Sequence, residues 1–287
     1  MHGTLLLGAV AYDPKVVTIW EGFIQYFAAR ALPFDVVLFT NYERQVESLL
    51  AGEIDVAWNS PLAWIEAERG AQAQGRQAMA IAMRDSDRDL TSLIVARADS
   101  PVRAVSDLRG KTVACGASDS PQATLIPLEV VAQSGLLPEG DFRVLRHEML
   151  VGKHGDHIGG ERAAARSLMD GKADAACMIE SNHALFAREG VFPPGATTVV
   201  TRTPAYDHCN FTVVAPADDP RFLRFRELLL GMSYHDPEVR PLLDMEGLKA
   251  WMPGRTTGYD LLNRAVDRFG TLDRRPVTAG SGERESG

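Results

Sequence analysis

The feature that most constrains this chain is a segment that occurs twice. Residues 48–60 read SLLAGEIDVAWNS, and residues 167–182 read SLMDGKADAACMIESN. Aligned without gaps, both follow the pattern S-L-x-x-G-x-x-D-x-A and then become polar. The shared letters are common ones, so chance is the competing interpretation. If the repeat is genuine, the chain contains two similar units.

Each copy of the repeat predicts the end of a helix, a tight turn and a short buried strand. Apolar residues recur at helical spacing before Gly52 and Gly171, and glycine is the residue that commonly ends a helix in the left-handed conformation. Asp55 and Asp174 then open the strands. Polar residues follow at each strand's carboxyl end, where open α/β sheets bind ligands. The repeat therefore predicts two α/β lobes facing one another across a cleft.

The composition is that of a globular protein with a core of ordinary size. Of 287 residues, 45% are hydrophobic and 24% are charged, and this length is enough for two domains. The net charge of −8 argues against a nucleic-acid partner, because no basic block offsets it. No apolar run approaches the roughly 20 residues of a membrane span. The three cysteines are too few and too scattered for a disulfide framework.

The amino terminus bears on where the protein works. Residues 1–3 run directly into an apolar strand, without the basic region and small-residue cleavage site of a signal peptide. We therefore expect a cytoplasmic protein as the sequence stands. A periplasmic or extracellular location is the alternative, if a signal peptide has been removed.

Strands and helices alternate along the chain, which predicts an α/β fold with mainly parallel sheets. Two Rossmann-like lobes joined by a hinge fit this order. Charged or polar stretches around residues 85–89 and 201–207 are candidate passages between them. The predicted divisions are residues 1–92 plus 203–272 for lobe 1, 93–202 for lobe 2, and a disordered polar tail at 273–287.

A loop of small residues at 116–124 precedes a predicted helix. Ser120 is placed to cap this helix, with Pro121 at its first position. Free backbone N–H groups and the helix dipole favour an anion there, and the hydroxyls of Ser118 and Thr124 would add donors. The competing interpretation is a cap that only starts a helix.

With these segments placed, the sequence resembles the type 2 periplasmic-binding fold, specifically the PhnD-like family of phosphate, phosphite and phosphonate solute-binding proteins. The resemblance spans roughly residues 4–269. It rests on the blocks YERQVESLLAGEIDVAWNSPLAW, DLRGKTVACGASDSPQATLIP, GGERAAARSLMDGKADAACM and YDHCNFTVV. It implies a ligand cleft between the lobes, a small anionic ligand and, for an exported protein, an ABC permease as partner.

The resemblance also implies roles for single residues. Tyr42 stands where a family tyrosine contacts the ligand. Ser120 stands in the family's Ser-Thr-Ser turn, but Pro121 and Gln122 take the other two places, so donors are lost. Glu161 occupies the place of a common family histidine. The altered turn argues against tight phosphonate recognition.

Two acidic residues favour a ligand that also carries an amine. Glu180 and Asp207 match positions that receive the amine in aminophosphonate binders. Asn59 and Ser60 are further candidates, because they follow a strand's carboxyl end and have no packing role there. The full set of predicted ligand-binding residues is Tyr12, Tyr42, Asn59, Ser60, Ser118, Ser120, Gln122, Thr124, Glu161, Glu180 and Asp207.

Several metal-ligating side chains support a second hypothesis, a cytoplasmic enzyme on the same fold, either a metal-dependent lyase or a biosynthetic enzyme. Its catalytic residues would be His157, Glu161, His183 and His208. A transition metal is the one cofactor that the residues suggest, although no pair shows a zinc-finger or H-E-x-x-H spacing. The candidate ligands are His154, His157, Glu161, His183, His208 and Cys209. The competing interpretation of His154 and His157 is that they are ordinary polar residues of a Gly-rich loop. A third hypothesis for the function is an intracellular ligand sensor.

Overall fold

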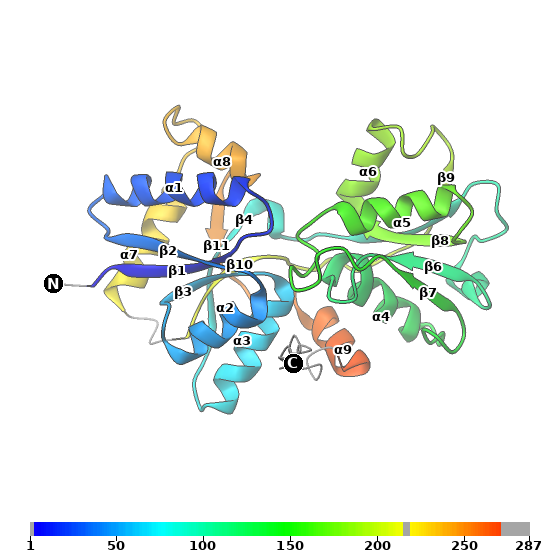
Figure 1. The fold of residues 1–287 in the computed structure, drawn as a ribbon, viewed down its shortest axis with the longest axis horizontal. Helices are drawn as coiled ribbons and strands as arrows, with labels where there is room; N and C mark the ends of the chain where they lie inside the picture. Colours follow the sequence, from blue (N-terminus) through cyan, green and yellow to red (C-terminus); the bar gives the residue numbers. More distant parts are fainter. Residues whose placement is uncertain (1–2, 215–218, 271–287) are drawn as a thin grey trace, which may run out of the picture.

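The computed structural model describes residues 3–214 and 219–270, so the predicted tail at 273–287 lies outside the described residues. Two β-sheets lie end to end along the long axis, and helices cover both faces of each (Figure 1). We call each sheet with its helices a lobe. Among the described residues, every helix is too short or too polar to cross a lipid bilayer.

The first sheet has six strands in the order β11-β4-β10-β3-β1-β2. Its strands are β1 (Leu5–Val10), β2 (Phe34–Phe39), β3 (Val56–Asn59), β4 (Met79–Arg84), β10 (Asn210–Val213) and β11 (Trp251–Pro253). The helices along the same parts of the chain are α1 (Lys15–Ala28), α2 (Tyr42–Ala51), α3 (Pro61–Ala73), α7 (Pro220–Leu230), α8 (Arg240–Glu246) and α9 (Asp260–Phe269). Strand β11 was not predicted, because three residues ending in proline carry no strand pattern.

The second sheet has five strands in the order β7-β6-β8-β5-β9. Its strands are β5 (Ser92–Arg97), β6 (Thr112–Cys115), β7 (Arg143–Arg146), β8 (Ala175–Ile179) and β9 (Thr197–Arg202). Its helices are α4 (Ile126–Gln133), α5 (Gly159–Met169) and α6 (Glu180–Arg188). The helix expected after Ser120 begins as a π-turn over Pro121–Leu125 before α4 continues it.

Both sheets are mixed, so the prediction of mainly parallel sheets was wrong. Strand β1 pairs in parallel with β2 and β3, and β6 pairs in parallel with β7 and β8. Strands β5 and β10 are antiparallel to both of their neighbours. These are the first strands after the chain crosses to the other sheet.

The repeated segments have the same structural role in the two sheets. Gly52 and Gly171 end helices with φ of 75° and 72°. The Asp55 carboxylate accepts a hydrogen bond of 2.8 Å from the backbone N–H of Leu6, and Asp174 accepts one of 2.9 Å from Thr112. Each aspartate therefore ties the start of its strand to the neighbouring parallel strand.

Two segments connect the sheets, and they pair with one another. The backbone N–H groups of Leu90 and Tyr206 each donate to the other residue's carbonyl, at 2.8 and 2.9 Å. Helix α9 also joins the lobes, because Arg268 on α9 forms an ion pair of 2.5 Å with Glu129 on α4. The domain boundaries drawn from the sequence stay a prediction.

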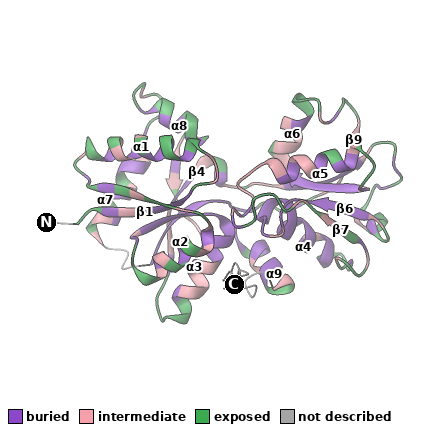
Figure 2. Cartoon of the chain, viewed as in Figure 1, coloured by how far each residue is buried: buried purple, intermediate pink, exposed green. Residues whose placement is uncertain are grey.

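The cores lie between each sheet and its helices, where buried residues concentrate on the strands and on the inner helix faces (Figure 2). The first lobe has an aromatic centre in which Trp58 packs on Phe211 at 4.6 Å between ring centroids and on Trp251 at 5.7 Å. The Arg84 guanidinium lies over the Trp58 ring at 5.1 Å. This core therefore positions a cation at the end of β4, beside the gap between the lobes.

Candidate functional site

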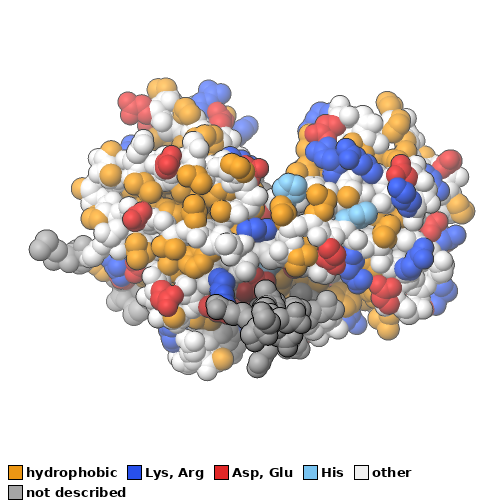
Figure 3. Space-filling model, viewed as in Figure 1, with side chains coloured by type: hydrophobic (Ala, Val, Ile, Leu, Met, Phe, Trp, Pro, Cys, Tyr) orange, Lys and Arg blue, Asp and Glu red, His pale blue; other side chains and the backbone are white. Residues whose placement is uncertain are grey.

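A cavity of about 280 Å³ lies between the two lobes, where the molecular surface is hollowed (Figure 3). It is lined from both sides by residues that lie near the ends of strands or in the first turns of helices. The first lobe contributes Tyr12, Arg84, Asp87 and His208, and the second contributes Gln122, Glu161, Ser181 and Asn182. Ligand cavities commonly occupy this place in open α/β sheets.

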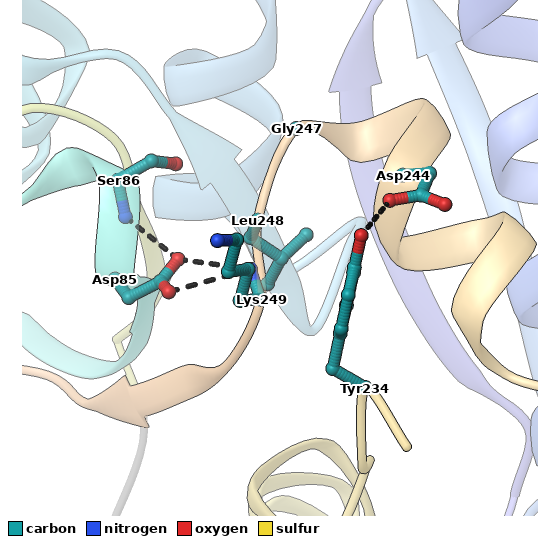
Figure 4. Close-up of a pocket in the computed structure, with 7 residues that line it drawn as sticks. All are labelled: Asp85, Ser86, Tyr234, Asp244, Gly247, Leu248 and Lys249. Carbon is teal, nitrogen blue, oxygen red and sulfur yellow. Dashed lines mark hydrogen bonds between the residues drawn. The ribbon is translucent and has the colours of Figure 1, made fainter. Parts of the chain in front are cut away.

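A second cavity, of about 330 Å³, opens on the first lobe alone (Figure 4). Its polar groups bond to one another. The Asp85 carboxylate accepts a hydrogen bond of 3.2 Å from the backbone N–H of Lys249, and the Tyr234 hydroxyl donates to Asp244 at 2.5 Å. Because this second cavity draws on one lobe and the first cavity draws on both, we take the cavity between the lobes as the candidate site.

The first-lobe wall of the site carries a buried ion pair. Arg84 donates to Asp87 through Nε at 2.5 Å and Nη2 at 2.9 Å, and it contacts Glu246 at 3.3 Å. Burial on its own would raise the pKa of Asp87, but Arg84 and His208 lower it to about 2. Asp87 is therefore ionised throughout the physiological range, and Arg84 holds it in place.

The second-lobe wall carries a carboxyl group that titrates near neutral pH. Glu161, in the first turn of α5, accepts hydrogen bonds from the Ile179 backbone at 3.0 Å and from the Asn182 amide at 2.8 Å. Burial nevertheless raises the pKa of Glu161 to about 7. Burial also raises the pKa of Asp156, against the opposing effects of His208 and Tyr42. A nearby positive group would favour the ionised form of both.

Helix α6 presents its amino terminus to the cavity. It begins at the carboxyl end of β8 and has no side-chain cap, while Ser181 and Asn182 of its first turn line the cavity. Backbone N–H groups in a first turn have no partner within the helix, and the helix dipole adds positive potential there. This end of the site therefore suits an oxyanion.

A segment of the second lobe reaches across to the first, and we call residues 152–156 the bridging segment. The backbone N–H of Tyr42 donates to the carbonyl of Gly152 at 3.2 Å, and Lys153 Nζ donates to the carbonyl of Ala11 at 2.9 Å. The Tyr42 hydroxyl donates to the Asp156 carboxylate. The bridging segment thus holds the two lobes together beside the cavity.

His154 is the centre of this contact and is 1% exposed. Its Nδ1 lies 2.6 Å from Ser60 Oγ, its Nε2 lies 3.8 Å from Glu43 Oε1, and its ring stacks on Tyr42 at 4.7 Å. Burial lowers the pKa of His154, but the carboxyl groups of Glu43, Asp119 and Glu66 outweigh burial, and the pKa is raised. The imidazolium form is therefore favoured in the docked segment.

The structure divides the predicted ligand-binding residues into three groups. Tyr12, Gln122 and Glu161 line the cavity. A second group, Tyr42, Ser60 and Ser120, contacts the bridging segment, which occupies the space beside these residues.

The third group lies elsewhere, mostly with partners of its own. The Asn59 amide bonds Gln45 and Thr212, Thr124 Oγ1 is buried without a partner, and the Ser118 backbone N–H donates to Glu148. Glu180 is bound by Thr91 and Arg202, and Asp207 by Arg255. Both acids predicted to receive an amine thus already have a protein partner.

The predicted metal and catalytic residues are also dispersed. His183 Nε2 lies 3.0 Å from Thr197 Oγ1, and His157 Nδ1 accepts a hydrogen bond of 3.0 Å from the Gly159 backbone. His154 lies in the bridging segment, whereas Glu161 and His208 line the cavity. Cys209 lies beside His208 and is buried, and burial raises the pKa of its thiol.

The predicted site residues did not include Arg84 or Asp87. Arg84 ends β4 as Asn59 ends β3, and Asp87 comes shortly after it, so the strand-end rule could have found both. The run of charges at 85–89 was taken for a passage between lobes instead. For Asp156, only the docking of the bridging segment reveals the role.

Comparison with known proteins gives one family and a group of similar structures. The sequence model of the family described as "ABC transporter, phosphonate, periplasmic substrate-binding protein" matches residues 9–259. PhnD1 from Prochlorococcus marinus in complex with methylphosphonate has a TM-score of 0.67 at 16% identity, covering 93% of this chain and 98% of that one.

XAC2383 from Xanthomonas citri bound to ATP has a TM-score of 0.70 at 18% identity, with the same coverage of 93% and 98%. The periplasmic aliphatic sulphonate-binding protein SsuA from Escherichia coli has a TM-score of 0.55 at 16% identity, covering 93% of this chain and 84% of that one. At these identities the likeness shows a shared fold. It confirms the predicted type 2 periplasmic-binding fold.

Proposed function

Because this chain belongs to the family of periplasmic substrate-binding proteins of phosphonate ABC transporters, we propose that its cleft binds a small solute carrying both an oxyanion and an amine. Ligand binding is supported as the function over the enzyme alternative by the family match and the similar structures. The observation that carries the choice of solute is that the positive amino terminus of α6 and the carboxyl group of Asp156 both lie at the cavity.

The oxyanion would lie at the start of α6. The first-turn N–H groups of Ser181 and Asn182, which have no partner within the helix, and the helix dipole favour a phosphonate-type group there. The Asn182 side chain adds an amide that already donates to Glu161 at 2.8 Å. Glu161 assists when it is protonated, because a neutral carboxyl group does not repel an anion.

The amine would lie towards Asp156. The Asp156 carboxyl group lines the cavity, and its pKa is raised because burial outweighs the opposing effects of His208, Tyr42, His154 and Arg84. An ammonium group would favour the ionised carboxylate in a hydrogen-bonded pair. Glu180 and Asp207, the acids implied by the family resemblance, are held by Arg202 and Arg255. We therefore assign the amine to a different acid from the family pattern.

We further propose that the solute is delivered to an ABC permease on the outer side of a membrane. Membership of a periplasmic transporter family supports this partner and this location. The paired connections at Leu90 and Tyr206 support a hinge motion, because two adjacent backbone strands bend as one unit. Closure would bring α6 towards Arg84 and Asp87.

The test is isothermal titration calorimetry with 2-aminoethylphosphonate, methylphosphonate, inorganic phosphate and ethylamine. We expect 2-aminoethylphosphonate to bind about tenfold more tightly than methylphosphonate, because one charge-assisted hydrogen bond contributes about 1.5–3 kcal/mol. Asp156→Asn should abolish that preference and keep methylphosphonate binding. Asn182→Ala should weaken binding of both phosphonates.

Glu180→Gln is the matched control. Glu180 also lies at the start of α6, after β8, but its carboxylate is bound by Thr91 and Arg202. It should leave both affinities unchanged. Equal affinities for the two phosphonates, or loss of the preference in Glu180→Gln, would contradict the proposed solute.

A further inference from the structure

Three side chains of different chemistry meet on the first-lobe wall of the cleft. Asp87 lies in the short turn after β4, and His208 and Cys209 directly precede β10. Their potential ligand atoms all lie within 4.8 Å of one another, and all three residues are buried. A carboxylate, an imidazole and a thiolate together form a donor set typical of zinc and related transition metals.

The separation of His208 from Asp87 matches that expected around a tetrahedral ion, and the separation of His208 from Cys209 is a few tenths of an ångström shorter. His208 Nδ1 lies 3.5 Å from Asp87 Oδ1 and 3.1 Å from Cys209 Sγ. Tetrahedral bonds of about 2.0–2.2 Å to nitrogen and oxygen and about 2.3 Å to sulfur place neighbouring ligand atoms roughly 3.3–3.6 Å apart. We propose that Asp87, His208 and Cys209 bind a divalent transition metal of the Zn²⁺ class.

The surroundings orient two of the three ligands. His208 Nε2 lies 3.4 Å from Gln122 Oε1, which leaves Nδ1 free to face Asp87 and Cys209 when Nε2 carries the proton. Arg84 donates to both carboxylate oxygens of Asp87 at 2.5 and 2.9 Å. Metal-binding histidines and carboxylates are commonly held by such outer hydrogen bonds. Gln122 belongs to the second lobe, so the ion would also stabilise the approach of the lobes.

The charge balance decides whether Arg84 would repel the ion. Four charged side chains act most strongly on the Cys209 thiol. Three of them are acidic, Asp87, Asp156 and Glu246, and the fourth is the cation Arg84. Acidic side chains therefore outnumber cations around the three ligands, which favours a divalent cation there. On binding, the Cys209 thiol gives its proton to solvent and its sulfur bonds the metal, so no oxidant or reductant is needed.

The test uses the chain freed of metal by a chelator and then titrated with Co²⁺ and with Zn²⁺. We expect one ion per chain and a rise in melting temperature. The Co²⁺ form should show the thiolate-to-cobalt charge-transfer absorption, which reports a sulfur ligand directly. Cys209→Ser should remove that absorption, and His208→Gln should weaken Zn²⁺ binding at least tenfold. Gln122→Ala should weaken it about tenfold, as for other outer-sphere partners.

Cys177→Ser and His183→Gln are the matched controls, because Cys177 is buried in β8 and His183 lies beside Thr197. Both should retain stoichiometry and spectrum. Circular dichroism checks that each variant is folded, and His208→Gln gives a second reading if Cys209→Ser misfolds. Binding below one ion per chain, or a charge-transfer band that survives Cys209→Ser, would overturn the assignment. Titration with the metal alone keeps this result separate from that for the solute.

Discussion

At the scale of single residues, burial sets the charge of the cleft. Asp87 is held ionised by Arg84, whereas Glu161 gains a pKa of about 7 from burial. The two acids differ because one has a guanidinium within 3 Å and the other is held by an amide and a backbone N–H. The site therefore changes its charge near neutral pH through Glu161.

Glu161→Gln should alter the pH dependence of stability. The pKa of Glu161 rises from an ordinary 4.5 to about 7 on folding. Its contribution to the free energy of unfolding is therefore fully present below pH 4.5 and is lost as pH rises to about 7. At pH 8 the variant should be more stable than the native chain by on the order of 3 kcal/mol, before any loss of hydrogen bonding.

Urea denaturation at pH 4.5 and pH 8 measures this difference. Glu180→Gln serves as the control, because its partners lower the pKa of Glu180. The free energy of unfolding of that variant should not exceed that of the native chain at pH 8. A Glu161→Gln chain destabilised equally at both pH values would show that Glu161 does not titrate as described.

Gly155 decides whether the bridging segment can dock. Its φ is 75°, and a Cβ placed on it would lie 2.8 Å from Ser120 Cβ. Gly155→Ala should therefore both strain the backbone and force the segment from the turn before α4. We expect a loss of more than about 1 kcal/mol in the free energy of unfolding, beyond the cost of the positive φ alone.

Gly190→Ala provides the matched comparison. Gly190 has a φ of 76°, but a Cβ there meets nothing within 4 Å. The difference in free energy of unfolding between the two variants separates the cost of the positive φ from the cost of the steric clash with Ser120. If both lose the same stability, docking against Ser120 contributes nothing measurable.

At the scale of elements, the bridging segment decides which side chains of the cleft are available to a solute. It places Lys153 against Ala11, His154 against Ser60 and Asp156 against Tyr42 of the other lobe. Residues expected to bind a solute instead bind the chain's own polar groups. The cavity lined by Arg84 and Glu161 is what remains open.

Docking of the bridging segment should weaken as pH rises. The pKa of His154 is raised, so its stabilising charge is present below its ordinary pKa of 6.5 and is lost as pH rises through the raised value. The groups that face it are Glu43 on α2, Glu66 on α3 and Asp119 in the turn before α4. Burial raises the pKa of Glu66 to about 7 and raises that of Asp119, so both acids also disfavour docking at high pH.

Hydrogen–deuterium exchange of residues 150–158, corrected for the intrinsic pH effect, measures this opening. We expect faster exchange at pH 9 than at pH 6 in the native chain, and a much smaller difference in His154→Gln. His157→Gln, in the same loop, should behave like the native chain. Identical pH dependence in all three chains would rule out His154 as the group responsible.

At the scale of the whole molecule, two lobes are joined by two crossing segments and by helix α9. The connections at Leu90 and Tyr206 share backbone hydrogen bonds, and α9 packs against α4 of the second lobe. Apolar side chains of α9 and α4 belong to one cluster, including Ile126 and Ala265. Movement of the lobes must therefore involve α9 as well as the hinge.

Arg268→Ala should destabilise the chain at this junction. Glu129 is fully buried and pairs with Arg268 at 2.5 Å, so removal of the guanidinium leaves a buried carboxylate without its cation. We expect a lower free energy of unfolding, because the buried acid loses a charge-assisted hydrogen bond. Arg44→Ala, which removes an exposed pair with Glu47, should cost less than about 1 kcal/mol. Thermal denaturation of both variants tests this, and equal losses would contradict it.

Local pattern was sufficient for most of the helices and strands and for the family. The repeated glycines and aspartates have the same role in both sheets because helix termination and strand pairing depend on neighbouring residues. Tyr12, Gln122 and Glu161 were predicted as site residues and line the cavity. Their positions follow from the end of a strand or the beginning of a helix, which the sequence shows directly.

By itself, the sequence determined two α/β lobes with polar residues at their facing ends. Only the tertiary structure decided which polar residues remain available to a solute. Segments far apart in the chain supply the partners of Tyr42, Ser60 and Asp207, and they bring Arg84 and Asp87 beside His208 and Cys209. The physical reason is that burial, charge pairing and metal geometry act between atoms a few ångströms apart in space, whatever their separation along the chain.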